Sequence, residues 1–192
     1  MNKEEITNLK RIEKKKNKKL ADIKWIIRII IITFILSLIL STTEEILLPF
    51  VPITIGIIIV LIFIFIGVIF DMIGVSVTAS DISVFNSMAS RKVKGAKLAV
   101  KFKQNTDKVS SFCNDVIGDI CGVVSGACSI TIASNLSNIL NTNFILLSIL
   151  ITAIVSSLTI GGKAIGKNIA INKSEIILYR FCLLLTIFYK EK

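Results

Sequence analysis

Four long apolar runs separated by polar segments dominate the pattern of this chain. A helix of about 20 apolar residues crosses the roughly 30 Å of hydrocarbon in a bilayer, so each run is long enough for a transmembrane helix or nearly so. The pattern therefore predicts an all-α fold, a polytopic membrane bundle of about four transmembrane helices. The expected spans lie at about residues 25–41, 51–77, 112–134 and 144–161.

Polar and basic segments flank these spans. Residues 1–23 are expected to form a basic tail, followed by a transmembrane domain over residues 24–172. Within that domain, residues 84–108 are too polar to cross a bilayer and suit a basic juxtamembrane helix on an anionic inner leaflet. Residues 173–192 contain a short apolar stretch with Arg180, which favours an interfacial or bundle-packed helix over a fifth span.

The distribution of charged residues predicts the orientation of the bundle in the membrane. The chain is 53% hydrophobic with a net charge of +10, and its basic residues gather in Lys3–Lys24, Arg91–Lys108 and Lys163–Lys173. Four spans with a cytoplasmic N-terminus place all three blocks on the inner side, as the positive-inside rule requires. We expect a multi-pass protein of the plasma membrane that contacts anionic lipid and binds no nucleic acid.

The cysteine pattern and the lack of histidine limit the kinds of metal or redox site that the chain can form. There is no histidine and no CxxC pair, so zinc, haem and thiol-redox sites have no support. We expect the four cysteines to be small, membrane-buried thiols. An enzyme is not expected, because no nucleophile, histidine or nucleotide-binding loop accompanies the acidic residues of the spans.

The third apolar run carries unusual polar residues. On a helix over residues 112–133, Asn114 and Asp115 share one arc with small residues, and Asp119 lies at the edge of that arc. A carboxylate in hydrocarbon costs several kcal/mol. We therefore expect this face to meet the bundle interior, a cavity or a partner cation.

The second run supplies further oxygen atoms. Asp71 is a carboxylate in its inner half, and Ser76, Ser80, Ser83 and Ser87 recur at helical spacing, which predicts a row of hydroxyls on one helix face. Serines at such spacing allow close helix packing, or they supply oxygens to an ion. The residues alone leave both readings open.

The predicted topology brings three polar sets to one depth: the serine row, the acidic turns of the third span, and Lys163 at the inner end of the fourth. Hydroxyl, carboxylate and amide oxygens suit a hard cation such as magnesium. The alternative is a structural network in which Lys163 neutralises an aspartate. The candidate metal ligands are Ser76, Ser80, Asn114, Asp115 and Asp119.

Four segments in order resemble a known family. TASDIS, KVKGAKLAVKFKQNTDKV, VIGDICG and IGGKAIGKNIA are similar to motifs of the transmembrane domain of the CorB/CorC (CNNM) magnesium and cobalt transporter family. The resemblance covers about residues 55–172. It implies a dimeric domain that binds a dehydrated magnesium ion through span serines, the asparagine of an I-G-N motif and the glutamate of a G-E-x-x-P-K motif.

Matched by position, Ser80 falls on the serine motif, Asp119 on the family's asparagine, and Lys163 on its glutamate. The last change puts an ammonium where the ion's counter-charge stands, so Asp119 and Lys163 look like a pair that neutralises itself. Two hypotheses follow. The chain is a divergent CorB-like protein that binds or transports a divalent cation, or it is a non-transporting membrane scaffold or accessory subunit with a structural Asp–Lys network.

Overall fold

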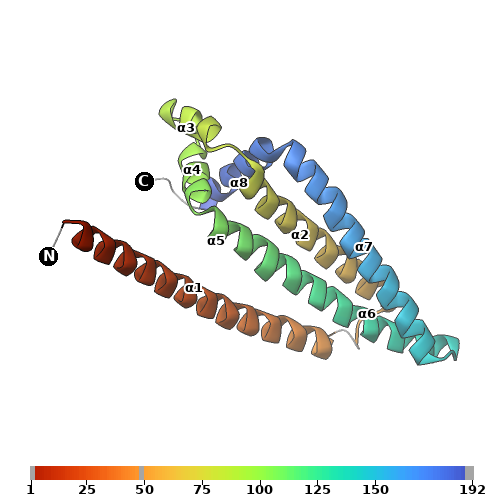
Figure 1. The fold of residues 1–192 in the computed structure, drawn as a ribbon. Coiled ribbons are helices and arrows are strands. Elements are labelled where there is room, and N and C mark those ends of the chain that lie inside the picture. The colour runs from red at the N-terminus through yellow and green to blue at the C-terminus, as the bar shows by residue number, and fades with distance from the viewer. Residues whose placement is uncertain (1–2, 48–49, 189–192) are drawn as a thin grey trace. The chain divides into compact units, whose positions relative to one another are not determined.

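The computed structural model describes residues 3–47 and 50–188, and within these residues it contains helices and no strands. Contacts divide the chain into two units after Leu38, inside the first helix, so the unit from Ile39 onward is described here by itself. In chain order the elements are α1 (Lys3–Leu47), α2 (Ile53–Ala79), α3 (Ile82–Ser90), α4 (Ala96–Gln104), α5 (Thr106–Ser111), the π-helix η2 (Phe112–Gly118), α6 (Asp119–Leu140), α7 (Phe144–Asn172) and α8 (Ser174–Phe188) (Figure 1).

The predicted all-α fold with four membrane-crossing helices is confirmed. Among the described residues, four helical stretches are long and apolar enough to cross a membrane: Ile23–Leu47, Ile53–Ala79, Thr106–Leu140 and Phe144–Asn172. The last three contain the spans predicted after the first, except for residues 51 and 52, which precede α2. The stretch over Thr106–Leu140 joins α5, η2 and α6 into one helical rod, so it begins earlier than the apolar pattern indicates.

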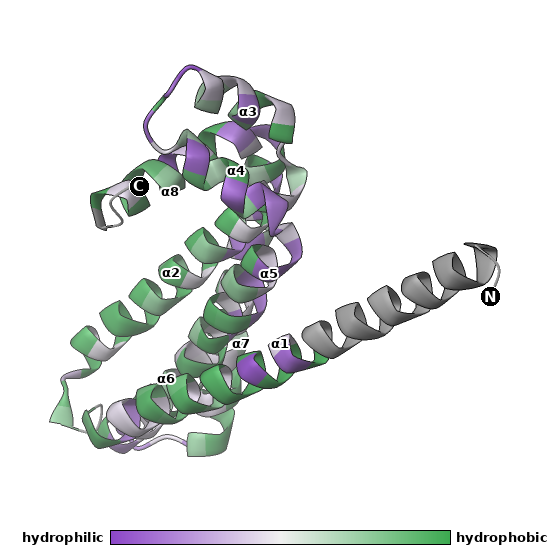
Figure 2. Ribbon diagram, turned by 90° about the vertical axis from the view of Figure 1, so that its left-hand side faces the viewer, coloured by the Kyte–Doolittle hydropathy of each residue, from purple (hydrophilic) through white to green (hydrophobic). Residues whose placement is uncertain are grey.

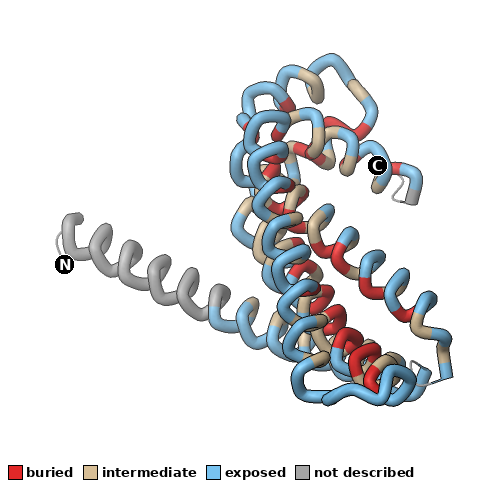
Figure 3. Tube along the Cα trace, turned by 90° about the vertical axis from the view of Figure 1, so that its right-hand side faces the viewer, coloured by how far each residue is buried: buried red, intermediate tan, exposed pale blue. Residues whose placement is uncertain are grey.

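Helix α2 is central to the bundle, and glycines let its neighbours approach. A Cβ at Gly67 would lie 3.1 Å from the Cβ of Cys121 in α6, and one at Gly166 in α7 would lie 2.8 Å from Cγ of Met72. Backbones this close leave no room for larger side chains. Buried positions therefore run along the facing sides of the long helices, as Figure 3 shows, while their outer sides are exposed.

One end of the bundle, which we call the basic end, gathers α3, α4 and α8 around the C-terminal end of α2. Its core consists of five buried side chains, namely Val77, Phe85, Ala99, Leu178 and Cys182. Figure 2 shows the polar residues concentrated here and the apolar ones along α2, α6 and α7. The other end, which we call the turn end, is the α6–α7 connection at residues 141–143.

The segment over residues 84–108 does not form the single helix that we predicted. Lys92 and Gly95 adopt left-handed backbone conformations, with φ of 56° and 83°, and α3, α4 and α5 are separate short helices. Glycine reaches this region without steric cost, which explains the break before α4. The short apolar stretch near the C-terminus forms α8, whose Leu178 and Cys182 pack into the basic end.

The predicted row of serines on one helix face is wrong. Helix α2 ends at Ala79, and Ser80 is extended, with φ of −73° and ψ of 156°. Asp81 then caps a new helix by accepting a hydrogen bond from the backbone N–H of Ser83. Ser83 and Ser87 therefore lie on α3, where both are exposed.

Candidate functional site

The candidate site lies where the basic-end half of α2 meets the π-helix η2. Asp71 of α2 is only 6% exposed. Asn114 of η2 lies directly against Gly74, where a Cβ would overlap the Asn114 Oδ1 atom. Only glycine at position 74 leaves space for this amide, so the local sequence of α2 makes the pocket that Asn114 occupies.

A second contact orients the Asn114 amide. Its Nδ2 donates a hydrogen bond to Ser110 Oγ across 3.4 Å, one helical turn earlier. The Oδ1 atom therefore points away from Ser110 and toward α2. It is buried there without a hydrogen-bond partner among the described residues.

Neighbouring polar residues of the π-helix differ in burial. A π-helix adds a residue to the turn and is frequent at functional sites. In η2 the Asn114 Oδ1 atom is buried, while Asp115 is exposed. The sequence predicts both residues on a common arc only if a regular α-helix is assumed. No residue pattern indicates the π-helix.

Four buried side-chain oxygens have no hydrogen-bond partner among the described residues: Asp71 Oδ2, Ser76 Oγ, Ser80 Oγ and Asn114 Oδ1. Buried polar atoms are nearly always paired, because an unpaired one loses its hydration without compensation. Three of the four belong to predicted metal ligands. The fourth, Asp71, is not among the predicted ligands, although a carboxylate within an apolar span is itself a signal of a functional site.

These oxygens occupy two sides of α2. Asp71 and Gly74 are three residues apart and share a face, with Cβ positions about 5–6 Å apart, so Asp71 and Asn114 lie on the same side of the helix. Ser76 is two residues beyond Gly74 and so lies about 200° around the helix from it. The structure therefore brings Asn114 near Asp71 and does not bring it near Ser76.

The other two predicted ligands are exposed. Asp115 faces away from the bundle, and the Asp119 side chain is 68% exposed. Asp119 forms an ion pair, because Lys163 Nζ on α7 donates to its Oδ1 across 3.1 Å. The predicted pairing of Asp119 with Lys163 is thus confirmed, and among the described residues no hydrogen bond joins any two of the five predicted ligands.

Beyond the site, Lys103 of α4 secures the end of α2. Its Nζ donates to the carbonyl oxygens of Val77 and Thr78, at 2.8 and 2.9 Å. Burial lowers the pKa of Lys103, and the nearby Asp81 carboxylate opposes that shift. Hydrogen bonds from the backbone N–H and the hydroxyl of Ser83 lower the pKa of Asp81.

The chemistry available here is that of a few hard oxygens. In the part of the chain that the structure describes, no three His, Cys, Asp or Glu side chains are grouped so that they could hold a metal. The four cysteines are buried thiols, as predicted. A site at Asp71 and Asn114 would thus have one carboxylate and one amide oxygen, and water or backbone oxygens would have to complete the coordination shell.

Comparison of the chain with protein-family models, with curated proteins and with solved structures gives no match. The resemblance to the CorB/CorC family therefore stays a prediction that depends on the four short motifs alone.

Proposed function

We propose that this chain is a membrane protein that binds a small hard cation between α2 and η2. The observation that carries the proposal is the set of buried oxygens that have no hydrogen-bond partner within residues 3–47 and 50–188, above all Asp71 Oδ2 and Asn114 Oδ1 on one side of α2. Two acceptors left unpaired in an apolar bundle are costly by themselves. A bound cation would satisfy both.

Magnesium is the first ion to test, with cobalt second, because the residues offer oxygen ligands and the resemblance implies these ions. Magnesium is commonly held by one or two carboxylates and retains several waters. Asp71 would supply the charge and Asn114 a neutral oxygen. With a single carboxylate we expect weak binding, with a Kd on the order of 1 mM. Transport of the bound ion across the membrane is a more specific version of this proposal.

The test is ligand-dependent thermal stability of the purified protein in detergent. At a magnesium concentration of ten times Kd, binding to the folded state alone adds about 1.4 kcal/mol to the free energy of unfolding. For a chain of this size that corresponds to a rise in Tm of roughly 3–6 °C. Asp71→Asn keeps the shape of the side chain but removes its charge, so we expect it to lose the rise.

Asp115→Asn is the matched control, because it makes the same chemical change at an exposed carboxylate one residue from Asn114. It should keep the full magnesium response. The cation proposal fails if the wild-type protein shows no magnesium-dependent rise in Tm. An equal loss in both variants would move the site away from Asp71.

The ion pair between Asp119 and Lys163 favours a second candidate, a non-transporting scaffold or accessory subunit. A pair that is already neutralised needs no ion, and it fixes α7 against α6. In that case magnesium should change Tm neither in the wild-type protein nor in Lys163→Glu, which restores the acid that the resemblance implies at this position.

We further propose a plasma-membrane location with the N-terminus and the basic end in the cytoplasm, next to an anionic inner leaflet. The support is the grouping of lysine and arginine in the segments that flank the spans, while the turn end over residues 141–143 is uncharged. Assembly as a homodimer is proposed on the resemblance alone.

A further inference from the structure

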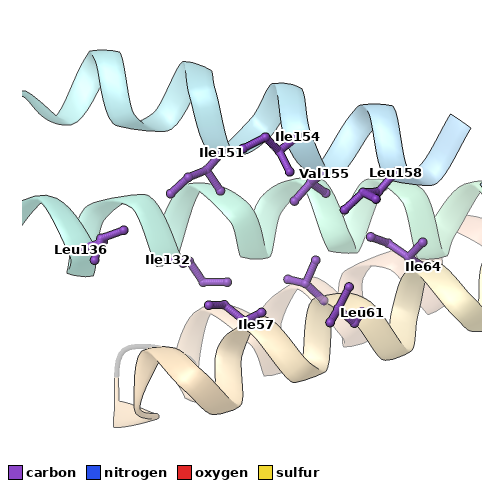
Figure 4. Close-up of a pocket in the computed structure, with 10 residues that line it drawn as sticks. Ile57, Leu61, Ile64, Ile132, Leu136, Ile151, Ile154, Val155 and Leu158 are labelled. Atoms are coloured by element: carbon purple, nitrogen blue, oxygen red, sulfur yellow. The ribbon is translucent and has the colours of Figure 1, made fainter. Parts of the chain in front are cut away.

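A long apolar groove lies between α2 and α7 in the half of the bundle nearer the turn end. Its volume is about 270 Å³, and α6 forms its back wall (Figure 4). All of the lining side chains are aliphatic: Ile57, Val60, Leu61, Ile64, Ile132, Leu136, Ile151, Ile154, Val155 and Leu158.

The groove exists because the close-packing glycines of α7 are confined to its other half. Near the basic end, Gly162 and Gly166 admit Val68 and Met72 of α2, with a Cβ at Gly162 only 3.0 Å from Val68 Cγ2. Toward the turn end, α7 presents Ile151, Ile154, Val155 and Leu158 to α2, all of them larger than glycine. Bulky facing side chains keep the two helices apart, and the space between them forms the groove.

The groove has a buried floor and an open side. Val60, Ile64, Ile132 and Val155 are buried, whereas rim residues such as Leu61 and Leu158 are exposed. The opening is therefore lateral, between α2 and α7. Because α2, α6 and α7 all lie within stretches long and apolar enough to cross a membrane, this opening faces hydrocarbon at bilayer depth.

We propose that this groove is a binding site for one acyl chain of a membrane phospholipid. The aliphatic lining offers no hydrogen-bond partner to a peptide or a headgroup, but it matches a hydrocarbon chain along its length. From Ile57 to Ile64 the groove follows α2 for about 10 Å, at 1.5 Å per residue. Unfilled, its walls would forgo dispersion contacts that a chain restores.

The lining favours a lipid chain over a helix as the occupant. Transmembrane helices associate through small residues and interhelical hydrogen bonds, whereas this groove is lined only by larger aliphatic side chains. An extended chain of methylene groups needs neither feature, and phospholipid is the source of such chains at this depth.

The test compares two isoleucines of α2 that differ in position but not in chemistry. Ile64 lines the floor, whereas Ile62 is exposed and does not line the groove. Ile64→Phe should project a ring from the floor and obstruct the groove, and Ile62→Phe should not. Proteins purified in mild detergent are compared by native mass spectrometry, and we expect wild type and Ile62→Phe to retain one more phospholipid than Ile64→Phe.

A second measurement uses the wild-type protein and so does not depend on the folding of a variant. A phosphatidylglycerol with a photoreactive diazirine near the end of one acyl chain is reconstituted with the protein, and adducts are mapped by mass spectrometry. We expect adducts on the buried floor residues Ile64, Ile132 and Val155. Adducts confined to outward-facing residues would overturn the proposal, as would equal lipid retention by both phenylalanine variants or a crosslinked second copy at the floor.

Discussion

Gly74 is the residue on which the geometry of the candidate site depends. A methyl group here would overlap Asn114 Oδ1, so Gly74→Ala must push the amide out of its place against α2. Overpacking of this kind costs roughly 1–3 kcal/mol, and we expect a lower Tm together with a weaker magnesium response. Thermal unfolding of the purified variant, with and without magnesium, measures both effects.

Gly126→Ala is the control for that substitution. It replaces a glycine of α6 whose added Cβ would meet nothing within 4 Å, so we expect unchanged or higher stability from the better helix propensity of alanine. If Gly74→Ala were as stable and as responsive to magnesium as Gly126→Ala, Asn114 would not be held in place by Gly74.

At this scale the sequence predicts which residues are chemically interesting better than it predicts where they point. Asn114, Ser76 and Ser80 are predicted ligands, and each has a buried oxygen without a hydrogen-bond partner in the described part of the chain. Asp115 and Asp119 were chosen on the same grounds and are exposed. The difference depends on how η2 packs against α2, where Gly74 leaves space for the Asn114 amide, and a helical period does not contain that packing.

At the scale of elements, the C-terminal end of α2 is held by a side chain from another helix. Lys103 donates two hydrogen bonds to the last carbonyls of α2, where the helix dipole also favours a cation. Lys103→Met keeps the aliphatic stem but removes both bonds. We expect it to lower the free energy of unfolding by on the order of 2 kcal/mol, measured by thermal unfolding.

Lys101→Met on the same helix provides the comparison, because Lys101 is exposed and both hydrogen bonds to the end of α2 come from Lys103. Its Tm should stay within about 1 °C of the wild-type value, as is usual for surface substitutions. Equal destabilisation by both variants would mean that the two hydrogen bonds contribute nothing. The sequence could not predict this interaction, because Lys103 and its acceptors are 26 and 25 positions apart and come together only through the turns after Arg91 and at Gly95.

At the scale of the whole molecule, span number and length follow from hydropathy, because each backbone polar group in hydrocarbon must be satisfied within its own helix. The ends of the helices are predicted less well from hydropathy. Ser80 and Asp81 end one helix and cap the next within a segment that reads as a continuous serine-spaced helix. The capping role of Asp81 was a readable signal, whereas the close contacts of α2 with η2 and α7 depend on tertiary packing.

The proposed orientation makes a prediction for the intact chain in cells. The native cysteines, at positions 113, 121, 128 and 182, are all buried, so a membrane-impermeant maleimide should leave the wild-type protein unlabelled. Thr142→Cys puts a thiol at the exposed turn end, and Lys97→Cys puts one at the exposed basic end. With the basic end in the cytoplasm of a plasma-membrane protein, Thr142→Cys should be labelled on intact cells and Lys97→Cys only after permeabilisation. Labelling of Lys97→Cys but not Thr142→Cys on intact cells would show that the topology is the reverse of the proposed one. Labelling of neither variant before permeabilisation would place the protein in an internal membrane.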